Sequence, residues 1–244
     1  MGDERISLSY AVPVYNEAAI IDSTIAIFLR DLEHLSETIR DFELIVVDDA
    51  SDDGTTGIVE AWAARDARVK VIRHARNQGV GVGIQTALAH ATREWFAVNC
   101  ADRPFDTREI ARFRSLFQTA DVVVVSRADR RANTWYRKLT SWVNYGLLVL
   151  LFRVPVNDCQ FIQFYRRSCL RDVALMARGT LVPPELILRA ARQGARIAEV
   201  EAPFQARPGG TAKYGHPKHA LTTVYEMIKL RIALWRPQRA AHPG

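Results

Sequence analysis

The chain has 244 residues, 48% of them hydrophobic, which is enough for one substantial core and about one domain. Its 33 Lys and Arg residues outnumber its 27 Asp and Glu residues, and this modest positive charge suits nucleotides, phosphates or an anionic membrane surface. The sequence contains no RNA- or DNA-binding signature, so nucleic acid is not an expected partner.

The first two thirds of the chain alternate short apolar runs with helical patterns. Strands are predicted over 6–14, 42–47, 69–73, 95–98 and 122–125, and helices over about 17–35, 55–64 and 81–92. This alternation predicts an α/β fold with a mainly parallel sheet and helices on both faces. Because no repeat, linker or change of composition divides the chain, we expect a single domain over residues 1–244.

A last, amphipathic helix is predicted over about 218–236. Apolar side chains recur on one face of it at Leu221, Val224, Tyr225, Ile228, Ile232 and Trp235. Packing against the core is the default for such a stripe, although the basic residues near Trp235 also suit a membrane surface. The longest apolar run, 146–152, is far shorter than the roughly 18 residues of a membrane span, so no crossing is expected.

The cysteines and the N-terminus indicate the compartment. Cys100, Cys159 and Cys169 are odd in number and lack C-x-x-C spacing, which argues against a disulfide framework and a structural zinc site. The first residues, MGDERISLSY, lack the basic and apolar regions of a secretory signal. We therefore expect a cytoplasmic protein, and a peripheral position on the inner face of the membrane stays open.

Polar or acidic residues stand where four of the predicted strands end. These stretches are 13–17 (PVYNE), 48–55 (DDASDDGT), 76–79 (RNQG) and 98–106 (VNCADRPFD). Ligands of open parallel sheets bind outside the carboxyl ends of the strands. The sequence therefore predicts a binding site at this edge of the sheet.

The second stretch favours a nucleotide. Asp side chains accept hydrogen bonds from a base or a ribose hydroxyl, and Gly54 permits a tight turn. Asp53 or Thr55 could instead cap the next helix. Capping does not explain the adjacent carboxylates of Asp48 and Asp49 at the end of an apolar strand.

The glycine-rich stretch 76–83 (RNQGVGVG) has two interpretations. A phosphate cradle at a helix N-terminus is one, and close packing of Gly81 and Gly83 on the sheet is the other. The spacing matches neither G-x-x-x-x-G-K-[ST] nor G-x-G-x-x-G. This argues against a P-loop nucleotide hydrolase and leaves a nicotinamide oxidoreductase as a remote alternative.

The series of motifs resembles glycosyltransferase family 2 with its GT-A fold. It comprises AVPVYNE, ELIVVDDASDDGT, RNQGVGVGIQTAL, a strand ending in CAD, and VVVVSR. The later segments YRKLTSWVN, VND and PPELILRAARQGARIAEVEAPFQARPGGTAKYG are similar to the dolichyl- and polyprenyl-phosphate sugar synthase branch. The resemblance runs from about residue 8 to residue 231.

The resemblance implies roles for individual residues. Nucleotide contacts fall on Pro13, Tyr15, Glu17, Asp49, Asp53 and Gly79. The Asp-Ala-Asp triplet of the family, which binds the diphosphate through Mg²⁺ or Mn²⁺, corresponds to Cys100, Ala101 and Asp102. Basic and polar residues around the acceptor phosphate correspond to Arg127, Arg137, Ser141, Arg207 and Lys213. Asp102, Arg127, Arg207 and Lys213 are the residues that we expect to carry catalysis.

Departures from the family pattern concentrate near the triplet. Cys100 replaces its first Asp, Gln163 stands where an arginine is expected, and the Q-x-x-P-P-E tail after the triplet is absent. Mg²⁺ prefers oxygen ligands to a thiol. Three hypotheses follow: weak Mg²⁺ binding by Asp102 and the ligand phosphates, with a further oxygen from Asp106 or Asp49; a metal-free site that uses Arg103 or another arginine; or a site that has lost transfer activity and only binds nucleotide sugars. We favour the first.

The resemblance implies transfer of a sugar from a GDP- or UDP-sugar to a polyprenyl or dolichyl phosphate, with inversion. One rival is transfer to a small soluble acceptor, and another is a catalytically silent protein that binds nucleotide sugars. An anionic phosphate acceptor needs no general base, which agrees with the lack of an evident His/Asp or Ser/His pair.

Overall fold

The computed structural model describes residues 4–128, 156–159, 161–171, 173, 175–177, 179, 181–205, 227 and 229–232. The strands in these residues are β1 (Ile6–Val14), β2 (Ile39–Asp48), β3 (Val69–Arg73), β4 (Trp95–Val98), β5 (Val122–Arg127), β6 (Ile162–Arg166) and β7 (Ile197–Ala202). The helices are α1 (Ala18–His34), α2 (Thr55–Arg65), α3 (Val80–His90), α4 (Arg114–Thr119) and α6 (Val182–Arg192), with short 3₁₀ helices η1 (Thr107–Phe113) and η2 (Arg167–Leu170).

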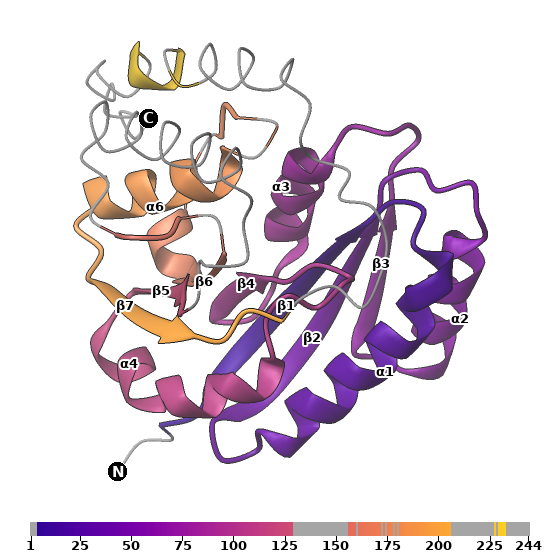
Figure 1. The fold of residues 1–244 in the computed structure, drawn as a ribbon, viewed down its shortest axis with the longest axis horizontal. Coiled ribbons are helices and arrows are strands. Elements are labelled where there is room, and N and C mark those ends of the chain that lie inside the picture. Colours follow the sequence, from indigo (N-terminus) through magenta and orange to yellow (C-terminus); the bar gives the residue numbers. More distant parts are fainter. Residues whose placement is uncertain are drawn as a thin grey trace, which may run out of the picture.

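The described strands form a seven-stranded sheet in the order β3-β2-β1-β4-β6-β5-β7 (Figure 1). Strands β1 to β4 run parallel to one another, and β5 runs parallel to β7, whereas β6 is antiparallel to both β4 and β5. The predicted α/β fold with a mainly parallel sheet is confirmed. The antiparallel insertion of β6 was not predicted, nor were β7 and α6.

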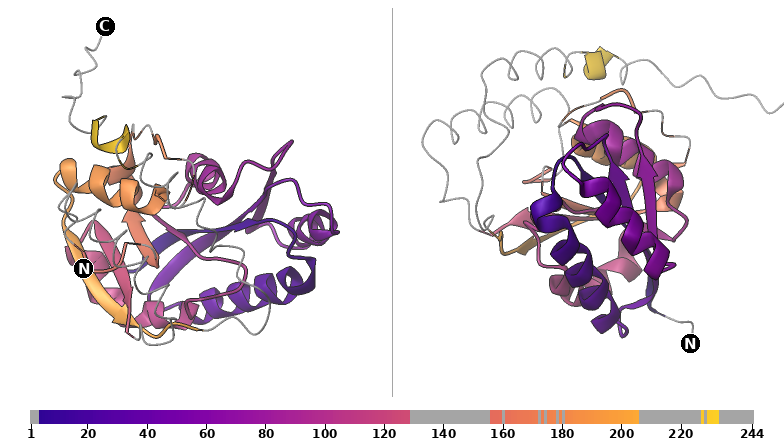
Figure 2. Two further views of the ribbon diagram at one scale, coloured as in Figure 1. Left: turned by 45° about the horizontal axis from the view of Figure 1, so that its top comes forward. Right: turned by 90° about the vertical axis from the view of Figure 1, so that its right-hand side faces the viewer.

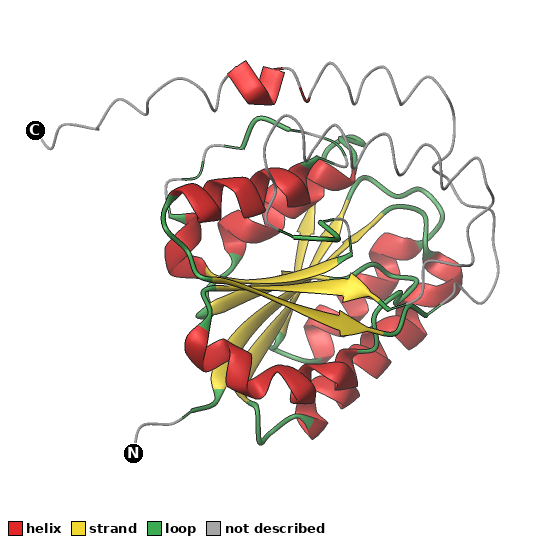
Figure 3. Cartoon of the chain, turned by 60° about the vertical axis from the view of Figure 1, so that its left-hand side comes forward, coloured by secondary structure: helices red, strands yellow, loops and turns green. Residues whose placement is uncertain are grey.

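Two cores cover the two faces of the sheet. Alternate residues of β1 and β2 point to opposite faces, as the period of a strand requires. One core joins the sheet to α1, η1 and α4, with Phe28, Phe113 and Phe117 among its buried side chains. The other joins it to α3 and α6. Figure 3 shows the strands between these helical layers, and Figure 2 shows α1 beside α2.

Gly83 lets α3 approach the sheet closely. A Cβ atom at this position would lie 3.1 Å from the Cβ atom of Pro13 on β1 and 3.9 Å from a methyl carbon of Val47 on β2. The packing interpretation is therefore confirmed for Gly83. Because Pro13 leads into the first polar loop, this contact also fixes α3 relative to the candidate site.

Part of the predicted C-terminal helix is described, and residues 227 and 229–232 are helical there. Met227 and Leu230 are buried in the second core, whereas Ile232 is 53% exposed. Two residues correspond to about 200° around a helix, so Leu230 and Ile232 face nearly opposite directions. Ile232 is the one member of the predicted stripe among the described residues, so the buried face there contains Met227 and Leu230 in place of the predicted residues. The other members lie outside the described residues: Leu221, Val224, Tyr225, Ile228 and Trp235. Among the helices that are described, none has the length and hydropathy to span a membrane.

Candidate functional site

The four predicted loops meet at the carboxyl edge of the parallel strands. Each contains a residue with left-handed backbone: Asn16 (φ 53°), Ala50 (φ 63°), Gly79 (φ 89°) and Arg103 (φ 50°). For a non-glycine residue this conformation costs on the order of 1–3 kcal/mol and persists when the surrounding structure holds it. Each of the loops that follow β1, β2, β3 and β4 therefore contains a backbone bend that the surrounding structure holds.

Reciprocal hydrogen bonds join the loops after β1 and β2. The amide of Asn16 donates to Asp52 Oδ1 at 2.8 Å, and the backbone N–H of Asp52 donates to Asn16 Oδ1 at 3.0 Å. The backbone N–H of Asn16 also donates to the Ser51 hydroxyl, and that of Glu17 donates to Thr55 Oγ1. The two loops therefore form one unit, with Glu17 at its rim.

The carboxylates of Asp53 and Asp48 accept hydrogen bonds from backbone N–H and hydroxyl groups of the same unit. Asp53 accepts hydrogen bonds from the backbone N–H and hydroxyl of Thr55 and from the backbone N–H of Ala18. Burial opposes ionisation, but these hydrogen bonds outweigh it and lower the pKa of Asp53. Asp48 is fully buried and accepts from the Thr56 hydroxyl at 2.5 Å. The N-cap of α2 is Gly54, so Asp53 lies one position before it and orders the entry to the helix through Thr55.

Asp49 connects the second loop to the third. Its carboxylate accepts hydrogen bonds from the backbone N–H groups of Gln78 (2.9 Å) and Gly79 (2.7 Å). His74 Nδ1 lies 2.7 Å from the same carboxylate, and His74 Nε2 lies 2.9 Å from Thr86 Oγ1. Sequence reasoning missed His74, although it follows β3 directly at the same edge. Asp49, predicted as a nucleotide contact, thus shapes the 76–79 loop.

Asn99 organises the turn after β4, and sequence reasoning missed it too. This fully buried amide donates to the Tyr10 hydroxyl at 2.8 Å and to the Phe105 carbonyl at 3.0 Å, while its oxygen accepts from the Cys100 N–H. Burial raises the pKa of Tyr10 far above its ordinary value, so the hydroxyl remains protonated and takes part in the network. Asn99 thereby holds the turn that contains the altered triplet.

The altered triplet places its residues in different environments. Cys100 is exposed, whereas Ala101 is 5% exposed and its carbonyl accepts a hydrogen bond from Thr24 Oγ1 at 2.8 Å. Asp102 is partly exposed, and its carboxylate has neither a hydrogen bond nor an ion pair with any residue that the structure describes. Within the described residues, no hydrogen bond or ion pair therefore competes with a ligand for the Asp102 carboxylate.

Asp106 is engaged by neighbouring residues. It accepts a hydrogen bond from the backbone N–H of Arg108 at the start of η1 and pairs with the Arg108 guanidinium at 2.7 Å. Gln205 Nε2 also donates to it at 3.2 Å. The Arg108 hydrogen bond lowers the pKa of Asp106. This arrangement gives Asp106 a capping role and weakens its candidacy as a metal ligand.

The predicted acceptor residues are described in part. Arg127, at the end of β5, pairs through Nε with the buried Asp158 at 2.7 Å. Gln163 is 6% exposed on β6 beside Val124, and its Nε2 finds no hydrogen-bond partner within the described residues. The remaining predicted contacts lie outside the described residues: Arg137, Ser141, Arg207 and Lys213.

The side chains at this edge offer few ligands for a divalent cation among the described residues. The described residues contain no group of three or more His, Cys, Asp or Glu side chains that could hold a metal ion. Mg²⁺ commonly binds through one or two carboxylates, with substrate phosphates and water as its other ligands. Asp102 therefore fits an ion shared with a bound diphosphate and does not by itself form a complete metal site.

Comparison with known proteins identifies the family of the chain. The model of the family described as glycosyl transferase family 2 matches residues 9–174. The glycosyltransferase YkcC of Bacillus subtilis is 29% identical over 168 residues, which are 68% of this chain and 51% of that protein. The undecaprenyl-phosphate mannosyltransferase of Micrococcus luteus is 27% identical over 213 residues, which are 83% of this chain and 85% of that protein.

Solved structures show the same fold. The mannosyltransferase PcManGT of Pyrobaculum calidifontis, in complex with GDP-Man and Mn²⁺, aligns with a TM-score of 0.60 at 20% identity. The alignment covers 94% of this chain and 64% of that one, so the chain spans about half to two thirds of some of the proteins that it matches. Because the family model covers well over half of the sequence, the chain belongs to glycosyl transferase family 2.

Proposed function

We propose that the chain transfers a sugar from a nucleotide diphosphate sugar to a polyprenyl phosphate, with inversion at the anomeric carbon. Family membership and the relative named as an undecaprenyl-phosphate mannosyltransferase support this proposal. The observation that carries it is the position of Asp102, whose carboxylate lacks a partner within the described residues and follows β4 at the edge where the four loops meet.

The proposed reaction is a direct displacement. An oxygen of the acceptor phosphate attacks the anomeric carbon, and the bond from that carbon to the nucleoside diphosphate breaks. The acceptor is already an anion near neutral pH, because the second pKa of a phosphomonoester is about 6, so the reaction needs no side chain as a base. Asp102 and the diphosphate would hold a divalent cation, and such an ion would supply positive charge to the leaving group.

The loops after β1, β2 and β3 are the proposed donor site. Tyr15 is 39% exposed there and offers an aromatic ring to the base, with Pro13 and Glu17 beside it in sequence. Asp49 acts through the 76–79 loop that its hydrogen bonds shape. Arg127 shares its charge with Asp158, so we propose that Arg137, Arg207 and Lys213 contribute most of the positive charge to the acceptor phosphate.

Calorimetric titration with GDP, UDP and their sugars, with and without Mn²⁺ or Mg²⁺, tests the donor site. We expect one nucleotide to bind more tightly with the cation, and we expect Asp102→Asn to remove that increase. Asp106→Asn is the matched control, because Arg108 and Gln205 already engage that carboxylate. If the chain binds no nucleotide, the proposal is wrong.

Transfer to a short polyprenyl phosphate in detergent, followed by mass spectrometry of the glycosylated lipid, tests the acceptor. We expect a product mass that corresponds to one added sugar. Turnover with a soluble phosphate acceptor, and none with the lipid, would favour the small-acceptor alternative.

The exposed Cys100 supports a second candidate, a protein that binds nucleotide sugars without transferring them. Under this alternative the donor binds without dependence on a cation, and no product forms. Cys100→Asp distinguishes the two, because it restores the family's carboxylate beside Asp102. If the parent protein shows no turnover and the Cys100→Asp variant gains turnover that depends on a cation, the second candidate is established.

A further inference from the structure

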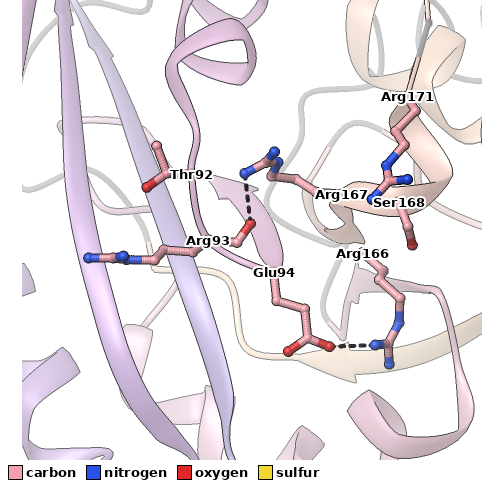
Figure 4. A pocket seen from close by; sticks show the side chains of 7 residues that line it. All are labelled: Thr92, Arg93, Glu94, Arg166, Arg167, Ser168 and Arg171. Carbon is pink, nitrogen blue, oxygen red and sulfur yellow. Dashed lines mark hydrogen bonds and ion pairs between the residues drawn. The ribbon is translucent and has the colours of Figure 1, made fainter.

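A second polar pocket lies at the opposite end of β4 from the candidate donor site. It has a volume of about 250 Å³, and its lining includes Arg93, Glu94, Arg166, Arg167, Ser168 and Arg171 (Figure 4). Strand β4 begins at Trp95 and the antiparallel β6 ends at Arg166, so these residues gather where the two strands meet at the amino end of β4. The proposed glycosyl transfer uses none of them.

Two of the four arginines are held by carboxylates. Arg93 Nε lies 3.1 Å from Asp41, and Figure 4 shows the Arg93 side chain extending away from the other guanidinium groups. Arg166 pairs with Glu94, donates to the Phe117 carbonyl at 3.0 Å and stacks on the Trp95 ring at 5.0 Å. Arg93 and Arg166 therefore each have a carboxylate partner, and the charge of Glu94 is matched.

Within the described residues, the other two arginines have no carboxylate partner. Arg167 donates to the backbone carbonyl of Arg93 at 3.3 Å, and Arg171 is exposed. Within the described part of the chain, neither forms an ion pair with a carboxylate. Both extend from the turn after β6, together with the exposed hydroxyl of Ser168. Among the residues that the structure describes, the pocket thus presents two positive charges and a hydroxyl donor without a matching anion.

We propose that Arg167, Ser168 and Arg171 bind a phosphate group in this pocket. Guanidinium groups match phosphate oxygens with paired N–H donors, and these charge-assisted hydrogen bonds are stronger than neutral ones. Pockets for drug-sized ligands usually exceed about 300 Å³, so 250 Å³ suits a single phosphate and its nearest atoms better than a nucleotide sugar. The phosphate belongs either to a small soluble molecule or to a lipid headgroup.

NMR titration of the ¹⁵N-labelled chain with inorganic phosphate, against sodium chloride at equal ionic strength, tests the pocket. We expect saturating shifts of the Ser168 and Thr92 amide signals with phosphate and none with chloride. The double variant Arg167→Gln, Arg171→Gln should weaken binding about tenfold or more, because both charged donors are lost. Arg65→Gln on α2 removes one exposed charge elsewhere and should leave the affinity unchanged.

Shifts that grow without saturating, or that chloride reproduces, would overturn the proposal, as would an unchanged affinity in the double variant. The experiment is independent of nucleotide binding, so its failure leaves the proposed glycosyl transfer intact.

Two further measurements identify the source of the phosphate. Saturable binding of glycerol phosphate supports a soluble ligand. Binding to phosphatidylglycerol vesicles and not to phosphatidylcholine vesicles, lost in the double variant, supports a headgroup. If neither binds, the proposal is wrong.

Discussion

The two ends of the parallel strands use buried carboxylates for different purposes. At the amino end, Glu43 on β2 accepts hydrogen bonds from Ser9 on β1 (2.6 Å) and from the Thr92 N–H before β4 (2.7 Å), and it pairs with Lys70 on β3 (2.5 Å). Burial alone would raise the pKa of Glu43, but these partners outweigh it and lower the pKa to about 2. One carboxylate thus joins three strands and the chain entering a fourth.

At the carboxyl end, the carboxylates shape loops. Asp48, Asp49 and Asp53 accept hydrogen bonds from the loops and helix starts around them, whereas Asp102 has no such partner within the described residues. The number of acidic residues at a sheet edge therefore does not predict how many of them can bind a ligand. What matters is which carboxylates remain once the hydrogen bonds of the loops have been assigned.

The largest expected effect comes from Asp49→Ala. It would leave His74 and the Gln78 and Gly79 N–H groups without their acceptor, so the free energy of unfolding should fall by about 3–5 kcal/mol. Urea denaturation measures this loss. The control Asp52→Ala, at an exposed carboxylate, should cost less than about 1 kcal/mol. Equal losses in the two variants would remove the distinction between buried and exposed carboxylates at this edge.

The next effect concerns Glu43 and pH. Its folded-state pKa of about 2 lies below the ordinary value of 4.5, so the stabilisation is complete above about pH 5 and is lost as the pH falls towards 2. The shift corresponds to about 3 kcal/mol. Unfolding free energies measured between pH 5 and 2 should show this loss in the parent chain and not in Glu43→Gln. Parallel pH profiles for the two proteins would contradict it.

Gly83→Ala should have an intermediate effect. The added Cβ atom would lie 3.1 Å from Pro13, and the resulting shift of α3 should lower the free energy of unfolding by about 1–3 kcal/mol. Gly57→Ala on α2 is the matched control, since no atom lies within 4 Å of the new Cβ, and it should stabilise the protein by about 0.5–1 kcal/mol. Thermal unfolding of both variants checks the contrast. A stabilised Gly83→Ala variant would show that α3 does not need this close approach.

The smallest effect on stability is expected for Asp102→Asn. Because no described residue forms a hydrogen bond or an ion pair with this carboxylate, the free energy of unfolding should change by less than about 0.5 kcal/mol. A larger loss in urea denaturation would mean that Asp102, like Asp49, serves the loops.

The sequence predicts best those features that depend on local patterns, such as the bounds of the strands. The bounds of β1, β3 and β4 agree with the predicted ranges, and the polar strand ends lie at one edge as expected. The roles of Asp49 and Asp53 could not be read in this way, because they depend on N–H groups brought near by other loops. Strand β6 was missed for a related reason: Gln163 interrupts a short apolar run, and pairing with distant strands defines the strand.

The position of β6 also has a consequence for the order of folding. Strands β1 to β4 pair with one another early in the chain, but the free side of β4 finds its partner in β6, where Ala97 pairs with the distant Phe164. Until that segment has been synthesised, the apolar run Trp95-Phe96-Ala97-Val98 forms an unpaired edge, which is prone to aggregate. Chains truncated before β6 should therefore need a chaperone to remain soluble.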